Sequence, residues 1–138
     1  MGSIAGDTVI NTVEGKIKIK DLVGRNQIGV YTMENHQVIV ADAFNFNKAY
    51  EDNQLFRVTF EDDSYIDCTH DHQFYALISK TKYGGKAAKD LTTNDMILAI
   101  DLSYKRVKSV QLNGVGDIYS LEVPHINWLF VNDVFIQN

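Results

Sequence analysis

The sequence predicts an all-β domain of about a dozen short strands, arranged as a barrel or a sandwich. Three observations support this: β-branched and aromatic residues fall in short runs, turn-forming residues separate the runs, and residues 16–19 alternate lysine with isoleucine as a half-buried strand does. The expected strands are residues 8–13, 16–19, 27–33, 37–46, 55–60, 65–68, 73–78, 96–100, 107–112, 118–123, 128–131 and 134–136. Pro124 ends one strand and begins a loop.

An internal repeat divides the chain into two related parts. Gly15-Lys16 followed by Lys20-Asp21-Leu22 recurs as Gly85-Lys86 followed by Lys89-Asp90-Leu91, an offset of about 70 residues. Helical turns are expected at residues 19–22 and 87–91, and residues 55–60 have a counterpart in residues 118–123. Chance similarity between short β-rich segments is the alternative. Two copies of one β unit predict a pseudo-twofold domain whose chain ends meet at its centre.

Composition narrows the class of protein. The 138 residues suit one domain, and 45% apolar residues suit a packed core. The net charge of -5 argues against a nucleic-acid surface, which is normally basic. No apolar run approaches the roughly 18 residues of a membrane span, and no signal peptide is visible. Cys68 is the single cysteine, so a reducing, cytoplasmic location is expected, with neither nucleic acid nor membrane as a partner.

Three features of the chain carry candidate chemistry. Ser3 precedes a Gly6-Asp7-Thr8 turn, Thr69 and His72 form a Thr-x-x-His pattern, and Asn138 is the last residue given. A serine hydroxyl is a nucleophile that needs activation, and histidine exchanges protons near neutral pH. Each feature alone is weak, and the combination is fairly specific.

Together these residues resemble an intein, a self-splicing protein of the Hint (hedgehog/intein) class. The segments that carry the resemblance are residues 3–10, 65–75, 89–97 and 118–138. It implies an all-β, horseshoe-like Hint fold over residues 3–138, with residues 1–2 as a flank or tag remnant. It also implies a mini-intein without an endonuclease, because residues 102–106 join two strands directly where an endonuclease would be inserted.

The resemblance implies a role for each residue in a single-turnover reaction of the chain on itself. Ser3 attacks the carbonyl of Gly2, Thr69 positions that bond, and His72 protonates the departing nitrogen. The side-chain amide of Asn138 then attacks its own carbonyl and forms a succinimide. No cofactor and no metal are required. The flanking sequences are partners in cis, with Gly2 as the last upstream residue, and they must supply the nucleophile that follows Asn138.

The sequence departs from the family pattern at three positions. Gln137 stands where inteins usually have histidine, and glutamine cannot act as a general acid. A second family histidine corresponds by counting to Asn127, so His125 becomes a candidate through a small register shift. Ser120 stands where many inteins have an aspartate that tunes the nucleophile. Control of both chemical steps is therefore expected to differ from that of a typical intein.

Other interpretations remain open on the sequence alone. The domain is expected to be a monomer, or two halves of a split intein written as one chain, with a complementary fragment as partner. A Hint domain of the autoprocessing kind would cleave without ligating, and a β-barrel binding module would have no chemistry. His70 and His72 could form a metal pair with Asp67 or Asp71. Cys68 is expected to be a buried packing residue.

Overall fold

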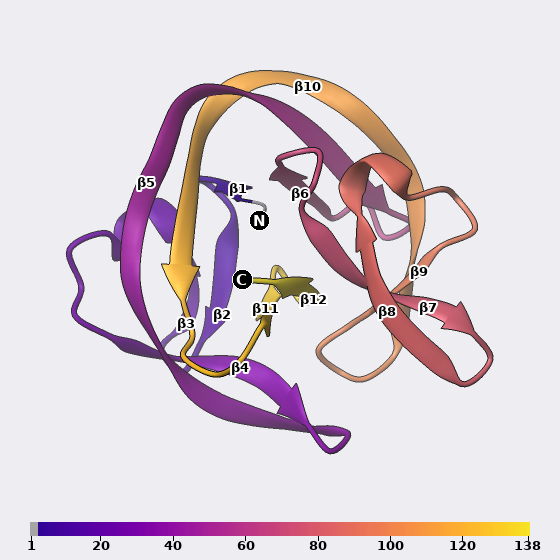
Figure 1. The fold of residues 1–138 in the computed structure, drawn as a ribbon, viewed down its shortest axis with the longest axis horizontal. Helices are drawn as coiled ribbons and strands as arrows, with labels where there is room; N and C mark the ends of the chain where they lie inside the picture. The colour runs from indigo at the N-terminus through magenta and orange to yellow at the C-terminus, as the bar shows by residue number, and fades with distance from the viewer. Residues whose placement is uncertain (1–2) are drawn as a thin grey trace.

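The computed structural model describes residues 3–138 and confirms the all-β class. Two short 3₁₀ turns, η1 (Ile19–Leu22) and η2 (Ala88–Asp90), lie where helical turns are expected. The strands of the described residues are β1 (Ile4–Ala5), β2 (Val9–Thr12), β3 (Gly15–Lys18), β4 (Ile28–Glu34), β5 (Gln37–Phe60), β6 (Tyr65–Cys68), β7 (Gln73–Ser79), β8 (Lys82–Ala87), β9 (Met96–Leu98), β10 (Tyr104–Glu122), β11 (Trp128–Val131) and β12 (Val134–Gln137). Antiparallel pairing connects all of them, and β5 and β10 form an arch around the chain ends (Figure 1).

The sequence predicted a break between two strands at residues 47–54 and another at residues 113–117, and both predictions were wrong. β5 runs unbroken for 24 residues and β10 for 19, and the two pair with each other along most of their length. The polar residues between the predicted strands resemble turns in sequence. They remain extended because each strand supplies hydrogen-bonding partners to the other.

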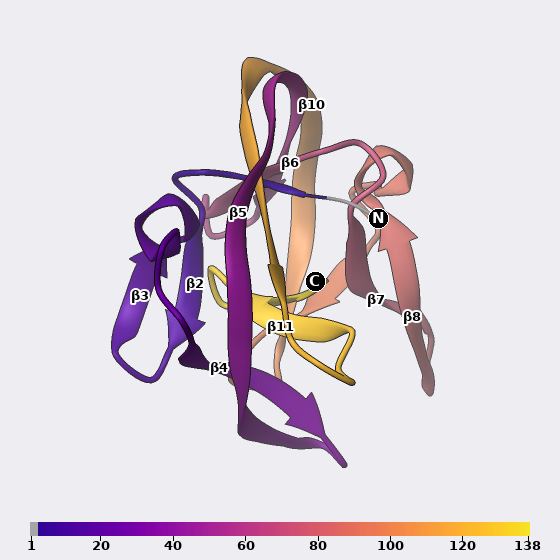
Figure 2. The same ribbon diagram turned by 60° about the vertical axis from the view of Figure 1, so that its left-hand side comes forward.

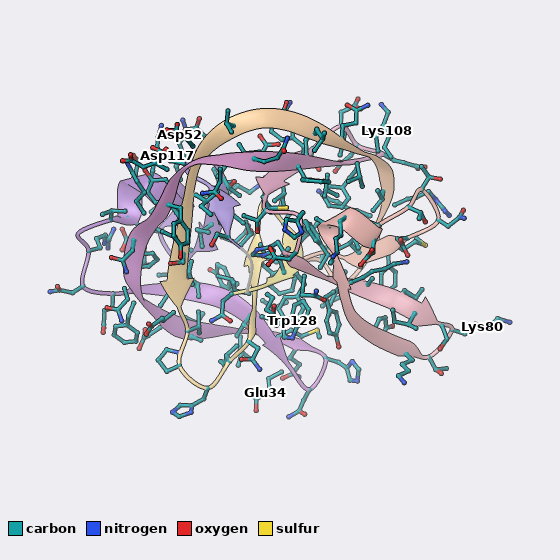
Figure 3. All side chains as sticks on the ribbon, turned by 45° about the horizontal axis from the view of Figure 1, so that its top comes forward. Glu34, Asp52, Lys80, Lys108, Asp117 and Trp128 are labelled. Carbon is teal, nitrogen blue, oxygen red and sulfur yellow. The ribbon has the colours of Figure 1, made fainter. Side chains whose placement is uncertain are left out.

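Irregular positions absorb the curvature of the arch. Asn45 and Asp52 in β5 have φ of 53° and 52°, and Gly114 in β10 has φ of 68°, the left-handed region that Asn, Asp and Gly tolerate best. Near the crown, the Asp52 backbone N–H donates to Asp117 Oδ1 at 3.3 Å, and the two residues lie together in Figure 3. The register shifts between β5 and β10 mark the same bulged regions.

β8 is a strand that the sequence did not predict, because Gly84 and Gly85 resemble a turn. It forms a hairpin with β7, and Lys80 in Figure 3 marks the tip of that hairpin. A Cβ on Gly85 would lie 2.7 Å from Gln73 Oε1 and 3.2 Å from the Trp128 ring. This glycine therefore permits a close approach between strands and side chains rather than a turn.

The predicted pseudo-twofold arrangement is present in the pairing pattern. β2 pairs with β3 and β4, and β4 pairs with β5; in the same way β7 pairs with β8 and β9, and β9 pairs with β10. β1 crosses to pair with β10, β6 pairs with β5, and β1 and β6 pair with each other. The units β1–β5 and β6–β10 are thus two copies of one motif that meet at β1 and β6.

The C-terminal hairpin of β11 and β12 lies between the two copies (Figure 2). β11 pairs with β2 through Val131 and Ile10, and β12 pairs with β7 through Ile136 and Phe74. One face of the hairpin belongs to the main core, which includes Leu129 and Ile136.

The other face of this hairpin joins a second apolar cluster, formed by Leu98, Phe130 and Phe135 with aromatic neighbours such as Tyr75 and Trp128. Both faces of the hairpin are buried, which explains why the sequences of β11 and β12 are almost entirely apolar. Within residues 3–138, the structure has no helix that is long and apolar enough to cross a membrane.

We expect Phe74→Ala to lower the free energy of unfolding by about 3–5 kcal/mol, because its fully buried ring fills the junction between β7 and β12. Leu112→Ala is the matched control, since Leu112 is 63% exposed on the arch and should change stability by less than about 0.5 kcal/mol. Urea denaturation of both variants measures the difference. Equal losses would contradict the assignment of the core.

Candidate functional site

Thr69 holds the backbone of Ser3 from two sides. The Ser3 backbone N–H donates to Thr69 Oγ1 at 3.0 Å, and the Thr69 backbone N–H donates to the Ser3 carbonyl oxygen at 3.0 Å. The pairing of Ile4 with Cys68 continues this contact into β1 and β6. The peptide nitrogen of Ser3 is therefore fixed by a residue 66 positions away in the chain.

The hydroxyl of Thr69 also interacts with Asp71. Burial raises the pKa of the Asp71 carboxyl. Hydrogen bonds from Thr69 and from the backbone, together with the charge of His70, lower it by more, so the pKa lies below its usual value. A hydroxyl has one proton to donate. That proton can go to Asp71 or, over 3.4 Å, to the Ser3 carbonyl oxygen, and in either case Thr69 Oγ1 accepts from the Ser3 N–H.

His72 is buried, with 3% of its surface exposed. Its backbone N–H donates to the Thr69 carbonyl at 3.2 Å, which closes the turn over residues 69–72. Its ring meets the ring of Phe74 edge to face, with 6.1 Å between centroids. The Ala88 N–H donates to the His72 carbonyl at 2.9 Å, so η2 supports the turn from outside.

The turn that carries His72 is the pseudo-twofold mate of the Gly6-Asp7-Thr8 turn. Thr8 N–H donates to the Ala5 carbonyl as His72 N–H does to Thr69. Further along, Ile19 N–H donates to the Thr8 carbonyl at 2.9 Å, as Ala88 N–H does to His72.

The third equivalent pair of hydrogen bonds is Lys20 N–H to the Gly6 carbonyl at 3.1 Å and Lys89 N–H to the His70 carbonyl at 2.9 Å. The sequence repeat did not reveal this equivalence, because Asp7 and Asp71 are the only identical pair within these turns. Thr8 and His72 thus occupy equivalent places on either side of the pseudo-twofold axis.

The last residues of the chain lie at the end of the C-terminal hairpin. The Asn138 backbone N–H donates to the Asn127 carbonyl at 2.8 Å, and Gln137 pairs with Trp128. These contacts fix the register of the final residues. Asn127, the residue reached by counting back along the sequence from Asn138, is therefore also the hydrogen-bonding partner of Asn138 in the structure.

The two ends of the described chain meet at a small cavity. It has a volume of about 20 Å³, roughly enough for one water molecule. Its polar lining comes from Ser3, His72, Ser120, Gln137 and Asn138. The apolar part of the lining is Ile4, Ile19, Leu121, Leu129, Val131 and Ile136, with Tyr119 between the two kinds.

Four of the six predicted site residues, Ser3, His72, Gln137 and Asn138, line this cavity, and Thr69 is hydrogen-bonded to Ser3. His125 is the exception. It is exposed, with φ of 65°, and borders a hollow on the other face of the hairpin near Trp128 and Phe135. The register shift that would bring it to the cavity does not occur, because the Asn138 amide is paired with Asn127.

Tyr119 is a wall of the cavity to which the sequence assigned no role. Its ring covers Gly6: a Cβ on this glycine would lie 2.7 Å from Tyr119 Cε1. The glycine of the Gly6-Asp7-Thr8 turn is therefore needed for close packing, and its φ is not positive. Pairing of Ile4 with Tyr119 across β1 and β10 is the feature that brings this ring over the turn.

The predicted alternative of a metal site receives no support from the side chains. His70 is exposed while His72 is buried, so the two rings lie in different environments. Over residues 3–138 no group of three or more His, Cys, Asp or Glu side chains is placed to hold a metal ion.

Several solved structures share this fold. A DnaB intein from Synechocystis sp. PCC 6803 superposes with a TM-score of 0.87 and 18% identity, covering 99% of this chain and 98% of that chain. The TvoVMA intein superposes with a TM-score of 0.84 and 20% identity, covering 99% of this chain and 98% of that chain. The bacterial intein-like domain from Clostridium thermocellum superposes with a TM-score of 0.83 and 21% identity, covering 100% of this chain and 99% of that chain.

No family model matches the sequence, and no curated protein matches it either. The fold is that of the inteins, as the sequence predicted, and the similarity extends over nearly the whole chain. At these levels of identity the likeness establishes architecture, and the chemistry has to be argued from the cavity.

Cys68 precedes Thr69 and has no exposed surface, and burial raises the pKa of its thiol well above the usual range. The thiolate is the reactive form, so we expect native protein at pH 8 not to react with Ellman's reagent. Unfolding in guanidinium should release one thiol per chain. Rapid stoichiometric reaction of the native protein would contradict this placement.

Proposed function

We propose that this chain is a self-splicing intein, which excises itself and joins the sequences on either side of it. One observation carries the proposal: Ser3 and Asn138, from opposite ends of the chain, line the same small cavity with His72. The fold shared with several inteins supports it. The reaction is intramolecular, takes place once per chain and needs no cofactor.

The first step is an N-to-O acyl shift at Ser3. Ser3 Oγ attacks the carbonyl carbon of Gly2, which lies outside the described residues. The carbon–nitrogen bond breaks, Oγ loses its proton, and the nitrogen gains one, which converts an amide to an ester. Thr69 holds the departing nitrogen through the 3.0 Å contact from the Ser3 N–H. The buried imidazole of His72 lines the same cavity and is the group that would supply the proton.

The later steps join the flanks and release the domain. A hydroxyl or thiol on the residue after Asn138 attacks the ester carbonyl, and Ser3 Oγ leaves with a proton. Asn138 Nδ2 then attacks the carbonyl carbon of its own residue. The peptide bond to the downstream flank breaks, its nitrogen leaves as an amine, and Asn138 becomes a succinimide. The amine freed in this way attacks the new ester or thioester between the flanks, which becomes an amide and returns the hydroxyl or thiol.

Proximity provides most of the catalysis in this scheme, since nucleophile and carbonyl belong to one chain. Gln137 lines the cavity beside Asn138 and can donate a hydrogen bond, but it has no proton to transfer at neutral pH. Ser120 faces the same cavity without the negative charge of an aspartate. We therefore expect the acyl shift to lack the influence of an anionic partner, and cyclisation of Asn138 to be slower than with histidine at position 137.

The partners follow from the scheme. They are the flanking sequences in cis, and the domain acts as a monomer unless it is divided into two fragments. A reducing, cytoplasmic setting remains part of the proposal, supported by the single buried thiol of Cys68.

Cleavage without ligation is the second candidate function. Gln137 favours it, because a weak final step would leave an ester at Ser3 open to hydrolysis. The similarity to an intein-like domain from Clostridium thermocellum is compatible with either activity.

The decisive experiment supplies both flanks, one protein before Gly2 and another, beginning with serine or cysteine, after Asn138. We expect intact-mass spectra over hours to show ligated flanks and excised domain. Ser3→Ala should abolish the ester and ligation while leaving cleavage at Asn138, and Asn138→Ala should stop release of the domain.

Other outcomes identify the alternatives. Cleavage at Ser3 without any ligated product would favour the second candidate. A folded precursor of unchanged mass would indicate a β-barrel module without chemistry.

Thr69 gives a further prediction about the first step. Thr69→Val keeps the shape of the side chain but removes the acceptor of the Ser3 N–H, so ester formation should slow by about 10-fold or more. Thr69→Ser keeps the hydroxyl and is the control. Hydroxylamine cleavage of the ester, measured in an Asn138→Ala precursor, gives the rate, and equal rates for the two variants would contradict the role of this contact.

A further inference from the structure

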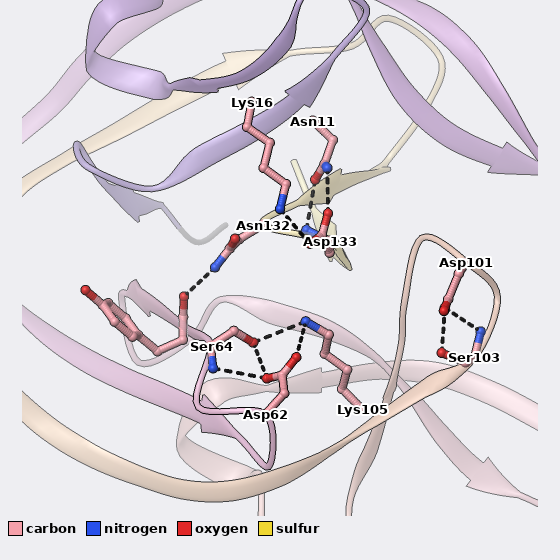
Figure 4. Close-up of polar contacts among 10 residues, drawn as sticks. Asn11, Lys16, Asp62, Ser64, Asp101, Ser103, Lys105, Asn132 and Asp133 are labelled. Atoms are coloured by element: carbon pink, nitrogen blue, oxygen red, sulfur yellow. Dashed lines mark hydrogen bonds and ion pairs between the residues drawn. The ribbon is translucent and has the colours of Figure 1, made fainter.

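Polar contacts from several distant parts of the chain hold the turn of the C-terminal hairpin. The turn consists of Asn132 and Asp133, whose φ values of 43° and 72° are both in the left-handed region. This is the backbone of a two-residue hairpin turn of the I′ type. Figure 4 shows the side chains that converge on it from other parts of the chain.

Asn11 and Asp133 bind each other in both directions. Asn11 Nδ2 donates to Asp133 Oδ1 at 2.8 Å, and the Asp133 backbone N–H donates to Asn11 Oδ1 at 2.9 Å. Asn11 is buried, with 7% of its surface exposed. Lys16 Nζ lies 2.6 Å from Asp133 Oδ2, and Lys16 in β3 pairs directly with Asn11 in β2. We call Asn11, Lys16 and Asp133 the hairpin clamp.

The backbone around the clamp connects the turn to both pseudo-twofold copies. Asn132 N–H donates to the Val9 carbonyl at 2.8 Å in the first copy, and Ile100 N–H donates to the Asp133 carbonyl at 2.8 Å in the second. Asn132 Nδ2 adds a bond to the Tyr65 carbonyl at 3.0 Å. The turn is therefore bound to β2, to β6 and to the segment that follows β9.

The reacting residue lies at the opposite end of the same hairpin. Asn138 is five positions beyond Asp133, about 16 Å along an extended strand. Its amide is paired with Asn127, so β11 and β12 move as one unit. A tilt or slip at the turn is carried directly to the cavity, where the free space admits roughly one water molecule.

We propose that Asn11 and Asp133 are positioning residues for the C-terminal step, which hold the β11–β12 hairpin so that Asn138 enters the cavity in register to cyclise. This rests on the proposed splicing function. Ser3 is placed independently, by Thr69 and by the pairing of β1 with β6 and β10. The clamp should therefore control Asn138 and leave the acyl shift at Ser3 almost unchanged.

The test uses a charge placed within the clamp and its compensation. Asn11→Asp sets a second carboxylate against Asp133 at a buried position. The double variant Asn11→Asp/Asp133→Asn restores a carboxylate–carboxamide pair with the roles exchanged, and Lys16 can pair with the new carboxylate across the strand. Asparagine keeps the tolerance for positive φ at position 133. Asp101→Asn, in an exposed turn with Ser103, is the matched control (Figure 4).

Two precursors separate the two steps. Cleavage after Asn138 is followed by intact mass in a Ser3→Ala precursor, and ester at Ser3 is followed by hydroxylamine cleavage in an Asn138→Ala precursor. We expect Asn11→Asp to slow cyclisation by about 10-fold to 100-fold and ester formation by less than about 3-fold. The double variant should return to within about 3-fold of the parent, and Asp101→Asn should match the parent.

Equal slowing of both steps, or failure of the double variant to recover, would overturn the proposal, provided that circular dichroism shows folded protein. If the parent precursor does not cyclise at all, the splicing function fails, and amide hydrogen exchange then tests the clamp alone. Faster exchange at Ile136 and Asn138 in Asn11→Asp, reversed in the double variant, supports the clamp. Unchanged exchange refutes it.

Discussion

Burial of the C-terminal hairpin on both faces is the constraint on which the rest of the structure depends. β11 pairs with β2, β12 pairs with β7, and Ala99 bridges to Val134, so both pseudo-twofold copies contribute partners. Alternate residues of the hairpin enter two different apolar clusters. A slip of one residue would exchange the faces and withdraw Asn138 from the cavity. Packing and chemistry therefore require the same register.

The pseudo-twofold supplies the other half of the site. Equivalent turns follow β1 and β6, and their strands meet where Ile4 pairs with Cys68. That pairing is what brings Ser3 beside Thr69. In the first copy the turn ends in a buried threonine, Thr8, and in the second it ends in His72. Two turns with the same backbone hydrogen bonds thus end in different side chains: a buried threonine in one, and in the other an imidazole that lines the cavity.

Much of this was predictable from the sequence, because local patterns determined it. The strand class, both 3₁₀ turns and the strands of the C-terminal hairpin follow from alternation, apolar runs and turn residues. The arch did not, since residues 47–54 are mostly polar and are held extended by a strand distant in sequence. β8 did not either, because its Gly84-Gly85 pair resembles a turn, whereas Gly85 serves the close approach of Gln73 and Trp128.

The site divides in the same way. Ser3, Thr69, His72, Gln137 and Asn138 were found through spaced motifs, and the structure gathers them. His125 does not reach the cavity, because the register shift that its candidacy required is absent: the Asn138 amide pairs with Asn127, the residue reached by direct counting. The cover of Tyr119 over Gly6 and the contacts of Asp133 with Asn11 depend on residues more than 100 positions apart. Such contacts leave no local signal in a single sequence.

The central claim is that Ser3 and Asn138 react within one cavity of one folded chain. The most direct test is the mass of the excised domain after incubation of a precursor with both flanks. The account predicts a domain lighter by one water than the free acid, because Asn138 leaves as a succinimide, together with ligated flanks. An excised domain that carries an ordinary C-terminal carboxylate from its first appearance would contradict it, since simple hydrolysis would then explain the release.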